Sequence, residues 1–484
     1  MKQSAEKVKN IGSWINGKEI TEGGRAQNEV RNPYDNEVIG IVNMATLDDL
    51  EAAIVSSHRA FEEAMKSMPA HQRSDILRKA ADELEASKEE FAATISQETG
   101  KTIRDSRGEV SRAIQLLRFA SSEAKANDGE LIKMDASTGG ENRLGFVKRY
   151  PVGVVAAITP FNYPLNLAMH KIAPAIATGC SVVVKPAGKT PLSTAMLAPL
   201  FERAGLPKGA LNIVMGAGAE IGEALVTHPY IKKVTFTGSE SVGMKLKELA
   251  GDKKVTLELG SNAPNIIFED ANLEMAVSNI LRGAFTYSGQ ACISAQRIYV
   301  QKGVYEKVMD LFVPKVEKLV VGDPASEQTD IGPLITLNAA ERVEQWVQEA
   351  SNEGARIIVG GKREGAIYHP TIVENVKSDM KVVCQEIFGP VVVMIPFEKE
   401  EEVVSMANDS NYGLQAAVFT SDVTKGLRIA DQLETGGVWI NEVSQFRLDH
   451  YPYGGVKKSG LGKEGVKYAM DDMTEMKFIG VNLI

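Results

Sequence analysis

The fold of this chain is decided by Ser181-Val182-Val183-Val184-Lys185, a run of three β-branched side chains framed by polar ends. Similar apolar runs cover residues 153–159, 211–215, 233–237 and 254–259, and helical patterns over 190–204, 219–226 and 240–250 separate them. Strands that are apolar throughout must be covered on both faces, and helices between them indicate parallel pairing. We therefore predict a doubly wound α/β sheet.

Such a sheet binds ligands beyond the carboxyl ends of its strands. These ends fall near Thr159, Lys185, Gly216 and Thr237. The sequence thus predicts a nucleotide site at that edge.

A second α/β unit follows Cys292. Strands are expected over 296–300, 357–359, 391–395, 416–420 and 437–441, with helices over 304–320, 340–352, 401–410 and 423–433. Upstream, short strands are expected over 12–44, and helices from a Thr46/Asp49 cap to about residue 125. The polar, glycine-rich segment 128–145 is typical of a hairpin. We expect it to pair with an extended tail over 475–482 and to form a subunit contact.

Composition excludes several classes of function. The chain has 484 residues, a formal net charge of −9 and three cysteines. This negative net charge gives no indication of binding to nucleic acid or to an anionic membrane. Cys180, Cys292 and Cys384 are too few and too far apart for a disulfide framework or a zinc site, which fits a cytoplasmic protein without a metal. The start, Met1–Lys7, has no apolar segment after it, so no signal peptide is expected.

Cys292 is expected in a short loop between rigid elements. A helical pattern begins after Asp270 as N-cap, Gly289 follows the helix end, and a strand begins at Gln296. A thiol in such a loop can meet both a substrate and an activating environment. The alternative is a small buried side chain that only packs.

Two glycine-rich turns suggest a dinucleotide site. Residues 216–222 come close to GxGxxG with one residue too many, and residues 237–243 form a second strand–glycine–helix junction. Either turn can present backbone N–H groups to a pyrophosphate, although such turns are also common as structural features. Lys185 can reach ribose hydroxyls or can be a solvated strand end. No carboxylate stands at Gly188-Lys189, and Lys189 can meet a 2′-phosphate, which favours NADP slightly.

Two further residues are candidates for chemistry. Glu258 ends a strand between apolar neighbours, so burial should raise its pKa toward the range of a general base; a salt bridge there is the alternative. Asn162 lies in a turn between Pro160 and Pro164 that can aim its amide as a hydrogen-bond donor, or can cap its own backbone.

Five segments in one order carry a resemblance. They are Ile158-Thr159-Pro160-Phe161-Asn162-Tyr163-Pro164, Leu257-Glu258-Leu259-Gly260, Gly289-Gln290-Ala291-Cys292, Glu386-Ile387-Phe388-Gly389-Pro390 and Pro452-Tyr453-Gly454-Gly455-Val456-Lys457-Lys458-Ser459-Gly460. Together they resemble the aldehyde dehydrogenase superfamily over nearly the whole chain. Within it the chain is similar to non-acylating, NAD(P)-dependent enzymes for lactaldehyde, succinate semialdehyde or glyceraldehyde 3-phosphate.

The resemblance implies roles for matching residues. Cys292 matches the nucleophile that forms a thiohemiacetal and then a thioester, and Asn162 with the Cys292 N–H would hold the oxyanion. Glu258 matches the base that activates water to release a carboxylic acid. The implied contacts with NAD(P) are Thr159, Pro160, Phe161, Lys185, Gly188, Lys189, Gly218, Gly238, Ser239, Gly243, Glu386 and Phe388.

The resemblance also implies three parts. These are an NAD(P)-binding domain (1–125 and 149–257), a catalytic domain (258–448) and protruding oligomerisation strands (126–148 and 466–484) that pair subunits into homodimers or homotetramers.

The sequence departs from the family pattern at two points. Gly260-Ser261-Asn262 stands where Gly-Gly-Lys is usual, and Ala291 stands before the nucleophile where relatives acting on phosphorylated aldehydes can carry arginine. The resemblance places Arg112, Tyr163, His170, Ser294 and the loop Gln445-Phe446-Arg447 along the substrate tunnel. Two arginines there favour a small aldehyde with an anionic or hydroxylated tail, unless Arg447 pairs with Asp449 or another subunit.

Three other functions stay open. A coenzyme A-acylating relative would pass on its thioester, but such relatives typically lack the carboxylate at Glu258. A non-catalytic binding protein with this fold usually loses the cysteine or the base, and both are present. An oxidoreductase without covalent catalysis would not need Cys292.

Overall fold

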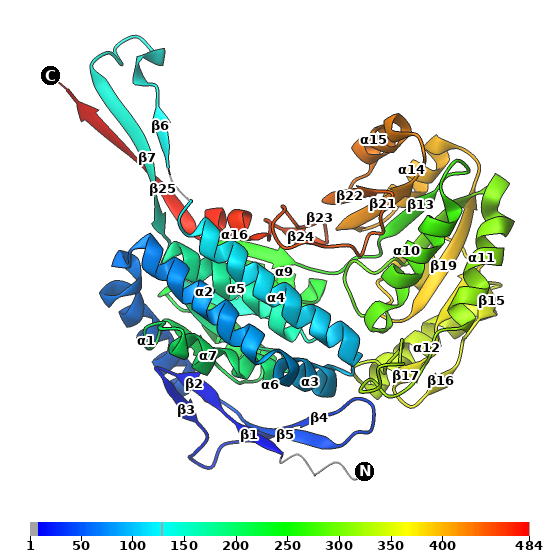
Figure 1. The fold of residues 1–484 in the computed structure, drawn as a ribbon, viewed down its shortest axis with the longest axis horizontal. Coiled ribbons are helices and arrows are strands. Elements are labelled where there is room, and N and C mark those ends of the chain that lie inside the picture. Colours follow the sequence, from blue (N-terminus) through cyan, green and yellow to red (C-terminus); the bar gives the residue numbers. More distant parts are fainter. Residues whose placement is uncertain (1–7, 127–128, 484) are drawn as a thin grey trace.

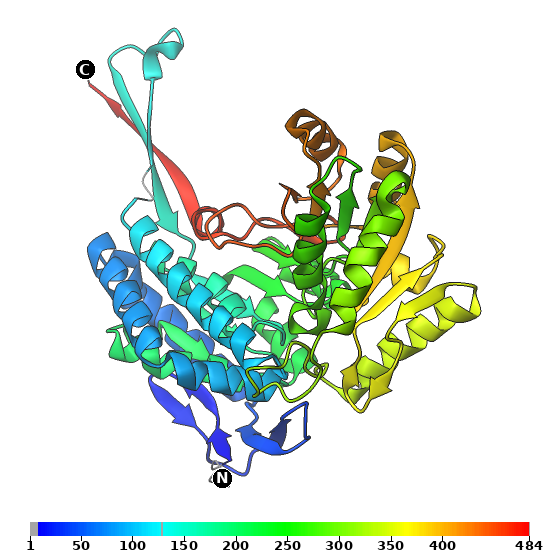
Figure 2. The ribbon, with the colours of Figure 1, turned by 45° about the vertical axis from the view of Figure 1, so that its right-hand side comes forward.

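The computed structural model describes residues 8–126 and 129–483. The expectations for Met1–Lys7, for Asp128 and for Ile484 lie outside that part of the chain. Two large sheets form separate halves of the molecule, and a long narrow sheet projects from one of them (Figure 1, Figure 2).

The first large sheet has eight strands in the order β24-β12-β11-β8-β9-β10-β2-β3. Its five central strands are parallel, as predicted. Their bounds are Val154–Ile158 (β8), Ser181–Lys185 (β9), Leu211–Ile213 (β10), Ile231–Thr237 (β11) and Lys254–Glu258 (β12). The edges are Ser13–Ile15 (β2) with Lys18–Ile20 (β3), and Gly460–Leu461 (β24), which returns from the end of the chain.

Helices cover both faces of this sheet because its strands are apolar on both faces. In β8, Val155 and Ala157 pack into a core with α2 (Ala70–Ala86), α4 (Ile103–Glu123), α5 (Pro164–Thr178) and α7 (Leu197–Arg203). Val154, Ala156 and Ile158 point the other way, toward α1 (Leu47–Glu63), α8 (Gly218–Thr227) and α9 (Glu240–Ala250). The side chains on both faces of β8 are therefore buried, as its continuous apolar sequence predicted.

Shorter elements complete this half. The Thr46/Asp49 capping box is present at the start of α1. The others are α3 (Lys88–Thr99), α6 (Leu192–Ala195), and a three-stranded sheet of β1 (Lys9–Ile11), β5 (Val38–Asn43) and β4 (Gln27–Arg31).

The second large sheet has seven strands in the order β15-β18-β19-β14-β13-β21-β22. The strands are Arg356–Val359 (β15), Thr371–Glu374 (β18), Val391–Phe397 (β19), Arg297–Gln301 (β14), Pro264–Ile267 (β13), Gln415–Phe419 (β21) and Gly437–Ile440 (β22). Its helices are α10 (Leu273–Phe285), α11 (Tyr305–Glu317), α12 (Leu337–Asn352), α13 (Lys381–Cys384), α14 (Glu400–Asn408) and α15 (Val423–Gln432). Small two-stranded pairs join Arg363–Glu364 (β16) to Ile367–Tyr368 (β17), and Tyr412–Gly413 (β20) to Val456–Lys457 (β23).

The projecting sheet confirms the expected pairing of hairpin and tail. β7 (Arg143–Pro151) lies between β6 (Glu130–Ile132) and β25 (Thr474–Asn482), and β25 pairs with β7 along its whole length. α16 (Val466–Asp472) leads into β25. Figure 1 shows this sheet standing away from the body.

Several expectations were wrong. Asn272, and not Asp270, caps α10; the Asp270 carboxylate accepts hydrogen bonds from Thr420 and Ser421 instead. The helix expected over 190–204 is divided at Met196. Strands β13 and β18 were not predicted, because each is only four residues long and β13 begins with proline, which strands disfavour.

Candidate active site

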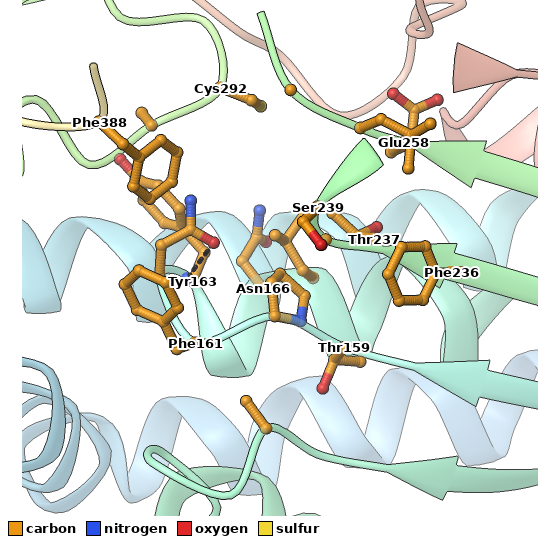
Figure 3. A pocket seen from close by; sticks show the side chains of 18 of the residues that line it. Thr159, Phe161, Tyr163, Asn166, Phe236, Thr237, Ser239, Glu258, Cys292 and Phe388 are labelled. Atoms are coloured by element: carbon orange, nitrogen blue, oxygen red, sulfur yellow. Dashed lines mark hydrogen bonds between the residues drawn. The ribbon is translucent and has the colours of Figure 1, made fainter. Parts of the chain in front are cut away.

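A cavity of about 1180 Å³ lies at the carboxyl ends of the first sheet's strands, where the second half of the molecule faces them. Figure 3 shows Cys292, Glu258 and Phe388 along one side and Thr159 and Phe161 on the other. Fifteen of the nineteen predicted site residues line it: Arg112, Thr159, Pro160, Phe161, Asn162, Tyr163, Lys185, Gly218, Gly238, Ser239, Glu258, Cys292, Glu386, Phe388 and Arg447. The cavity therefore lies at the edge of the sheet where the sequence predicted ligand binding.

The loop that carries Cys292 is held in an unusual backbone conformation. After α10, Tyr287 and Ser288 have φ of 50° and 52°, and Gly289 has φ of 70°. A Cβ on Gly289 would lie 2.2 Å from the carbonyl oxygen of Gly389, so only glycine fits there. The Ser288 hydroxyl donates to the Gly332 carbonyl at 2.8 Å. Such strain persists only where surrounding contacts fix it, and here it sets the position of the thiol.

The Cys292 thiol is a weak acid in this environment. Burial raises its pKa to about 12, although the Tyr453 hydroxyl, 3.2 Å from Sγ, and the Arg447 cation both oppose that rise. At neutral pH the resting form is therefore the thiol, and its proton must leave before sulfur can attack a carbon.

The Asn162 amide points toward the Cys292 loop. Its Nδ2 donates to the Gln290 carbonyl at 3.0 Å, and its Oδ1 accepts from the Tyr163 N–H at 3.1 Å. One Nδ2 hydrogen remains for an oxyanion formed next to Cys292.

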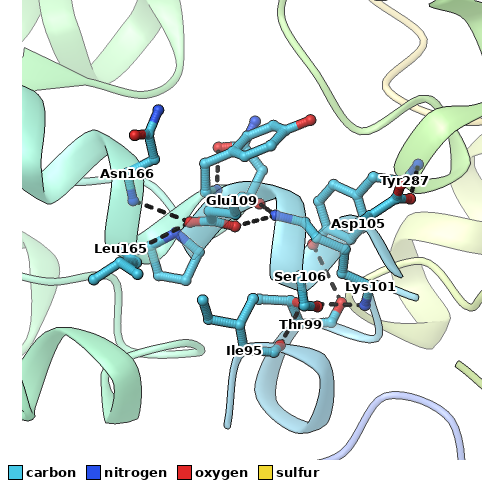
Figure 4. A network of polar contacts seen from close by, with 12 residues as sticks. Ile95, Thr99, Lys101, Asp105, Ser106, Glu109, Leu165, Asn166 and Tyr287 are labelled. Carbon is cyan, nitrogen blue, oxygen red and sulfur yellow. Dashed lines mark hydrogen bonds and ion pairs between the residues drawn. The ribbon is translucent and has the colours of Figure 1, made fainter. Parts of the chain in front are cut away.

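A buried ion pair between Lys101 and Glu109 (Figure 4) fixes the backbone of Asn162. The Lys101 ammonium pairs with Glu109 and donates to the Asn162 carbonyl at 2.9 Å. Glu109 in turn accepts from the N–H groups of Leu165 and Asn166, at 3.0 and 3.1 Å, and so caps α5. This pair was not predicted, because nothing near Lys101 or Glu109 in the sequence marks them as buried partners.

Glu258 has the environment of a proton acceptor. It is 2 % exposed, and within the described residues neither carboxylate oxygen has a hydrogen-bond partner. Burial and the negative charge of Glu464 raise its pKa well above the usual value. The salt-bridge alternative is thereby excluded for the structure as described.

The opposite end of the cavity suits a dinucleotide. The helices α8 and α9 begin at its wall without a side-chain cap, leaving N–H groups for a phosphate. The Thr159 hydroxyl is buried without a partner in the described structure, and a Cβ on Gly218 would meet nothing within 4 Å. Burial lowers the pKa of Lys185 and raises that of Glu386 to about 7. Hydroxyl groups of a ribose would give the Thr159 hydroxyl a partner and would add hydrogen bonds to Lys185 and Glu386, which already bond the Pro186 carbonyl and the Ser261 N–H.

Four predicted site residues do not line the cavity. Gly188 and Lys189 are exposed beyond its rim, and Gly243 packs inside α9, where a Cβ would lie 2.4 Å from Leu259. His170 is 2 % exposed and bonds Asp449 at 2.8 Å, so it supports the wall from behind and does not face a substrate. Ser294 is likewise turned away, since its hydroxyl donates to carbonyl groups of α10.

Both arginines at the substrate end have carboxylate partners. Arg112 pairs with Asp449 at 2.6 Å, and Arg447 pairs with Glu464 at 2.8 Å. Burial alone would raise the pKa of Asp449, but Arg112 and His170 hold it well below the usual range. The expected alternative partner of Arg447, Asp449, is therefore taken by Arg112. The Nε of Arg447 stays buried without a partner in the part of the chain that is described.

The departure Gly260-Ser261-Asn262 has a structural role. The Ser261 N–H donates to Glu386 at 2.9 Å, and Asn262 donates to the Val383 carbonyl at 3.0 Å. These bonds join the end of β12 to the segment that carries Glu386, and Glu258 keeps its place.

Comparison with known proteins agrees with this geometry. Residues 20–479 match the aldehyde dehydrogenase family. The chain is 48 % identical to 3-sulfolactaldehyde dehydrogenase of Priestia aryabhattai, over 99 % of this chain and 100 % of that protein. The structure of aldehyde dehydrogenase 21 from Physcomitrella patens, in complex with succinate, superposes with a TM-score of 0.96 at 40 % identity, covering 98 % of this chain and 99 % of that one.

A third similarity is to glyceraldehyde-3-phosphate dehydrogenase GapN from Methanocaldococcus jannaschii, complexed with NADP. Its TM-score is 0.91 at 42 % identity, covering 95 % of this chain and 100 % of that chain. The protein belongs to the aldehyde dehydrogenase family. It is an oxidoreductase that acts on aldehydes, and the predicted family, fold class and enzyme class are confirmed.

Proposed function

We propose that this enzyme uses NAD(P) to oxidise a small aldehyde with an anionic or hydroxylated tail to its carboxylic acid. The observation that carries the proposal is the placement of a thiol, a free amide hydrogen and an unpaired buried carboxylate around one cavity. Cys292, Asn162 and Glu258 supply them. The relatives named above act on sulfolactaldehyde or hold succinate, which supports an anionic tail.

The first half of the reaction belongs to Cys292. Its thiol gives its proton to solvent, and Sγ bonds the aldehyde carbon as the π bond of the carbonyl opens. The carbonyl oxygen becomes an oxyanion near the remaining Nδ2 hydrogen of Asn162. NAD(P), when held in this cavity, would supply the acceptor for the hydride that leaves this carbon. The chain then holds a thioester on Sγ.

The second half belongs to Glu258. Its carboxylate takes a proton from water, the water oxygen bonds the thioester carbon, and the C–S bond breaks to release the acid and restore the thiolate. A coenzyme A-acylating enzyme needs no such base. The unpaired, buried Glu258 therefore favours hydrolysis.

The cofactor would lie across the first sheet. Lys185 and Glu386 would contact ribose hydroxyls, Phe388 the nicotinamide, and the N-terminus of α9 a phosphate. Exposed Lys189 follows the cavity wall at Ala187 and is free to meet a 2′-phosphate, which favours NADP slightly over NAD. The complex of GapN with NADP supports this preference.

For the tail of the aldehyde we assign Arg112 and Arg447, with Tyr163 beside them. Each guanidinium has more donors than its one carboxylate uses, and the buried Nε of Arg447 has no partner among the described residues. An anionic or hydroxyl group would satisfy these donors.

We further propose three larger-scale assignments. The first large sheet without its edge strand β24, together with its helices, is the NAD(P)-binding domain (1–125 and 149–257), and the second is the catalytic domain (258–448). The segments 126–148 and 466–484 join subunits into a homodimer or homotetramer.

None of the described helices is long and apolar enough to cross a membrane. All three cysteines are free, which suits the cytoplasm.

One assay tests the proposal. Small aldehydes, each anionic one matched with a neutral one of similar length, are oxidised with NAD or NADP and followed at 340 nm, with and without coenzyme A. We expect free acid as product, higher kcat/KM for the anionic members, and higher kcat/KM with NADP. A thioester of coenzyme A as product would overturn hydrolysis.

Two variants test the tail assignment. Arg112→Ala and Arg447→Ala should raise KM for anionic aldehydes about tenfold or more, because each removes a charged hydrogen bond of about 1.5–3 kcal/mol. Arg118→Ala, on the same helix as Arg112 but exposed and paired with Glu85, is the control. Unchanged KM for every anionic aldehyde in both variants would contradict the assignment.

A further inference from the structure

The hydroxyl group of Tyr453 contacts the reacting atom of the enzyme. Tyr453 Oη lies 3.2 Å from Cys292 Sγ, and it makes no other hydrogen bond within the described structure. The tyrosine is 2 % exposed, so it is largely shielded from bulk solvent. A buried hydroxyl requires a partner, and here the partner is the sulfur.

The tyrosine ring is fixed by charged neighbours. The Arg447 guanidinium lies over its face, 3.5 Å from the ring centre, and is itself bonded to Glu464 at 2.8 Å. Glu464 also accepts from Lys171 at 2.8 Å. The position of Oη relative to Sγ is thus set by a chain of buried contacts and not by free rotation of the side chain.

Loss of the Cys292 proton fixes the direction of this hydrogen bond. While Cys292 is a thiol, either group can donate. Once the sulfur has lost its proton it can only accept, and Tyr453 becomes the donor. Burial raises the pKa of Tyr453 well above its usual value, so the hydroxyl keeps its proton over the working pH range. A hydrogen bond to an anion is about twice as strong as one between neutral groups.

We propose that Tyr453 is the hydrogen-bond donor that stabilises the Cys292 thiolate, held in place by the Arg447 cation on its ring. The inference rests on the proposed role of Cys292 as nucleophile. It adds a residue that offsets part of the cost of forming a thiolate in this buried site, both before the attack on the aldehyde and when the thioester releases the sulfur.

Alkylation of the full-length enzyme by iodoacetamide tests this inference without requiring a substrate. Tyr453→Phe removes the hydroxyl and keeps the ring under Arg447. Tyr451→Phe is the matched control, because its hydroxyl contacts the Phe446 carbonyl and Gln415 and not the thiol. Cys384, which is partly exposed, is an internal reference in the same samples.

We expect the pKa of Cys292 to rise by about one unit in Tyr453→Phe, which lowers the thiolate fraction about tenfold at pH 8. A more basic thiolate is more nucleophilic, with a slope of about 0.45, so the alkylation rate of Cys292 should fall about threefold. Cys384 should react at the same rate in all three proteins. The kcat for an aldehyde should fall while KM for NADP stays unchanged.

An alkylation rate of Cys292 that is equal or higher in Tyr453→Phe would overturn the inference, whatever the activity. Suppose that the alkylation rate does not fall in Tyr453→Phe, while wild-type Cys292 is alkylated and Cys292→Ser is inactive. The proposed role of Tyr453 is then wrong, and the proposed role of Cys292 as nucleophile stands. If Cys292→Ser keeps full activity, the proposed covalent mechanism fails together with the inference.

Discussion

The ammonium group of Lys101 donates a hydrogen bond to the main-chain carbonyl of Asn162, at 2.9 Å, from a position with no solvent exposure. Its cation also lies 3.8 Å from the centre of the Tyr163 ring. The amide that would hold the oxyanion is thus anchored to a buried ion pair, in which Lys101 lies in the loop between α3 and α4 and Glu109 lies within α4. The position of this proposed catalytic amide therefore depends on a buried ion pair.

Removal of this ammonium should destabilise the fold. Lys101→Met leaves Glu109 buried without its cation, and breaking such a pair costs about 3–5 kcal/mol in free energy of unfolding. Chemical unfolding measures the loss, with exposed Lys79→Met as control. The double variant Lys101→Met/Glu109→Gln should recover part of it. A variant as stable as the control would show that the pair contributes nothing.

Replacement of Glu258 should separate the two halves of the reaction. Glu258→Gln keeps the shape but cannot take a proton from water, so the steady-state rate should fall about 10²–10⁴-fold. Rapid mixing should still show a burst of reduced cofactor, because the first half does not need Glu258. Exposed Glu248→Gln should behave as wild type. Loss of the burst together with the steady-state rate would contradict this division.

The activity should depend on the pH through Glu258 as well. Its pKa is raised by burial first and by Glu464 second, so the carboxyl is protonated over a wider pH range than a free glutamate. A protonated carboxyl cannot accept the proton of water. The hydrolytic rate is therefore expected to increase as the pH rises through this pKa, and a rate that falls over that range would contradict the assignment.

Cofactor affinity should follow the ionisation of Glu386. Burial raises its pKa to about 7, and only the carboxylate accepts two hydroxyl hydrogen bonds. Binding of NADP, measured by fluorescence titration, should thus strengthen as the pH rises from 6 to 8. Glu386→Gln should bind about tenfold more weakly at pH 8 and lose this pH dependence. A variant with the wild-type pH profile would assign the effect to another group.

Gly289 should tolerate no side chain. In Gly289→Ala the new Cβ meets the Gly389 carbonyl oxygen at 2.2 Å, and the residue has φ of 70°. We expect a loss of about 2 kcal/mol or more in stability and a larger loss of activity, because the loop must shift and carry Cys292 with it. Gly205→Ala has φ of 98° but meets nothing within 4 Å, and should cost only about 1 kcal/mol. Equal effects of the two changes would contradict the steric argument.

The projecting sheet should hold subunits together. Met476 and Phe478 lie on one face of β25 and are 65 % and 53 % exposed in the single chain. Met476→Glu/Phe478→Glu should produce monomers in light scattering after size exclusion, because an interface does not bury unpaired charges. Lys477→Glu, on the opposite face, should keep the assembly. An unchanged mass of the double variant would place the contact elsewhere.

The sequence by itself determined most of the elements and the family of the protein. Runs such as Ser181–Lys185 are apolar on both faces, and this local property already requires a covered parallel sheet. The order of the motifs around Asn162, Glu258 and Cys292 likewise identified the family before any coordinates. Short elements such as β13 escaped because four residues carry too little periodicity.

Only the tertiary structure decided which groups are partners. Lys101 and Glu109, Arg447 and Tyr453, and His170 and Asp449 are brought together by packing between distant segments, and no spacing along the chain encodes that distance. Burial then fixes their charges, because the cost of an ion depends on its surroundings and not on its own residue type. The sequence already named Glu258 as a candidate base, but only the structure shows that both carboxylate oxygens are buried and without partners among the described residues.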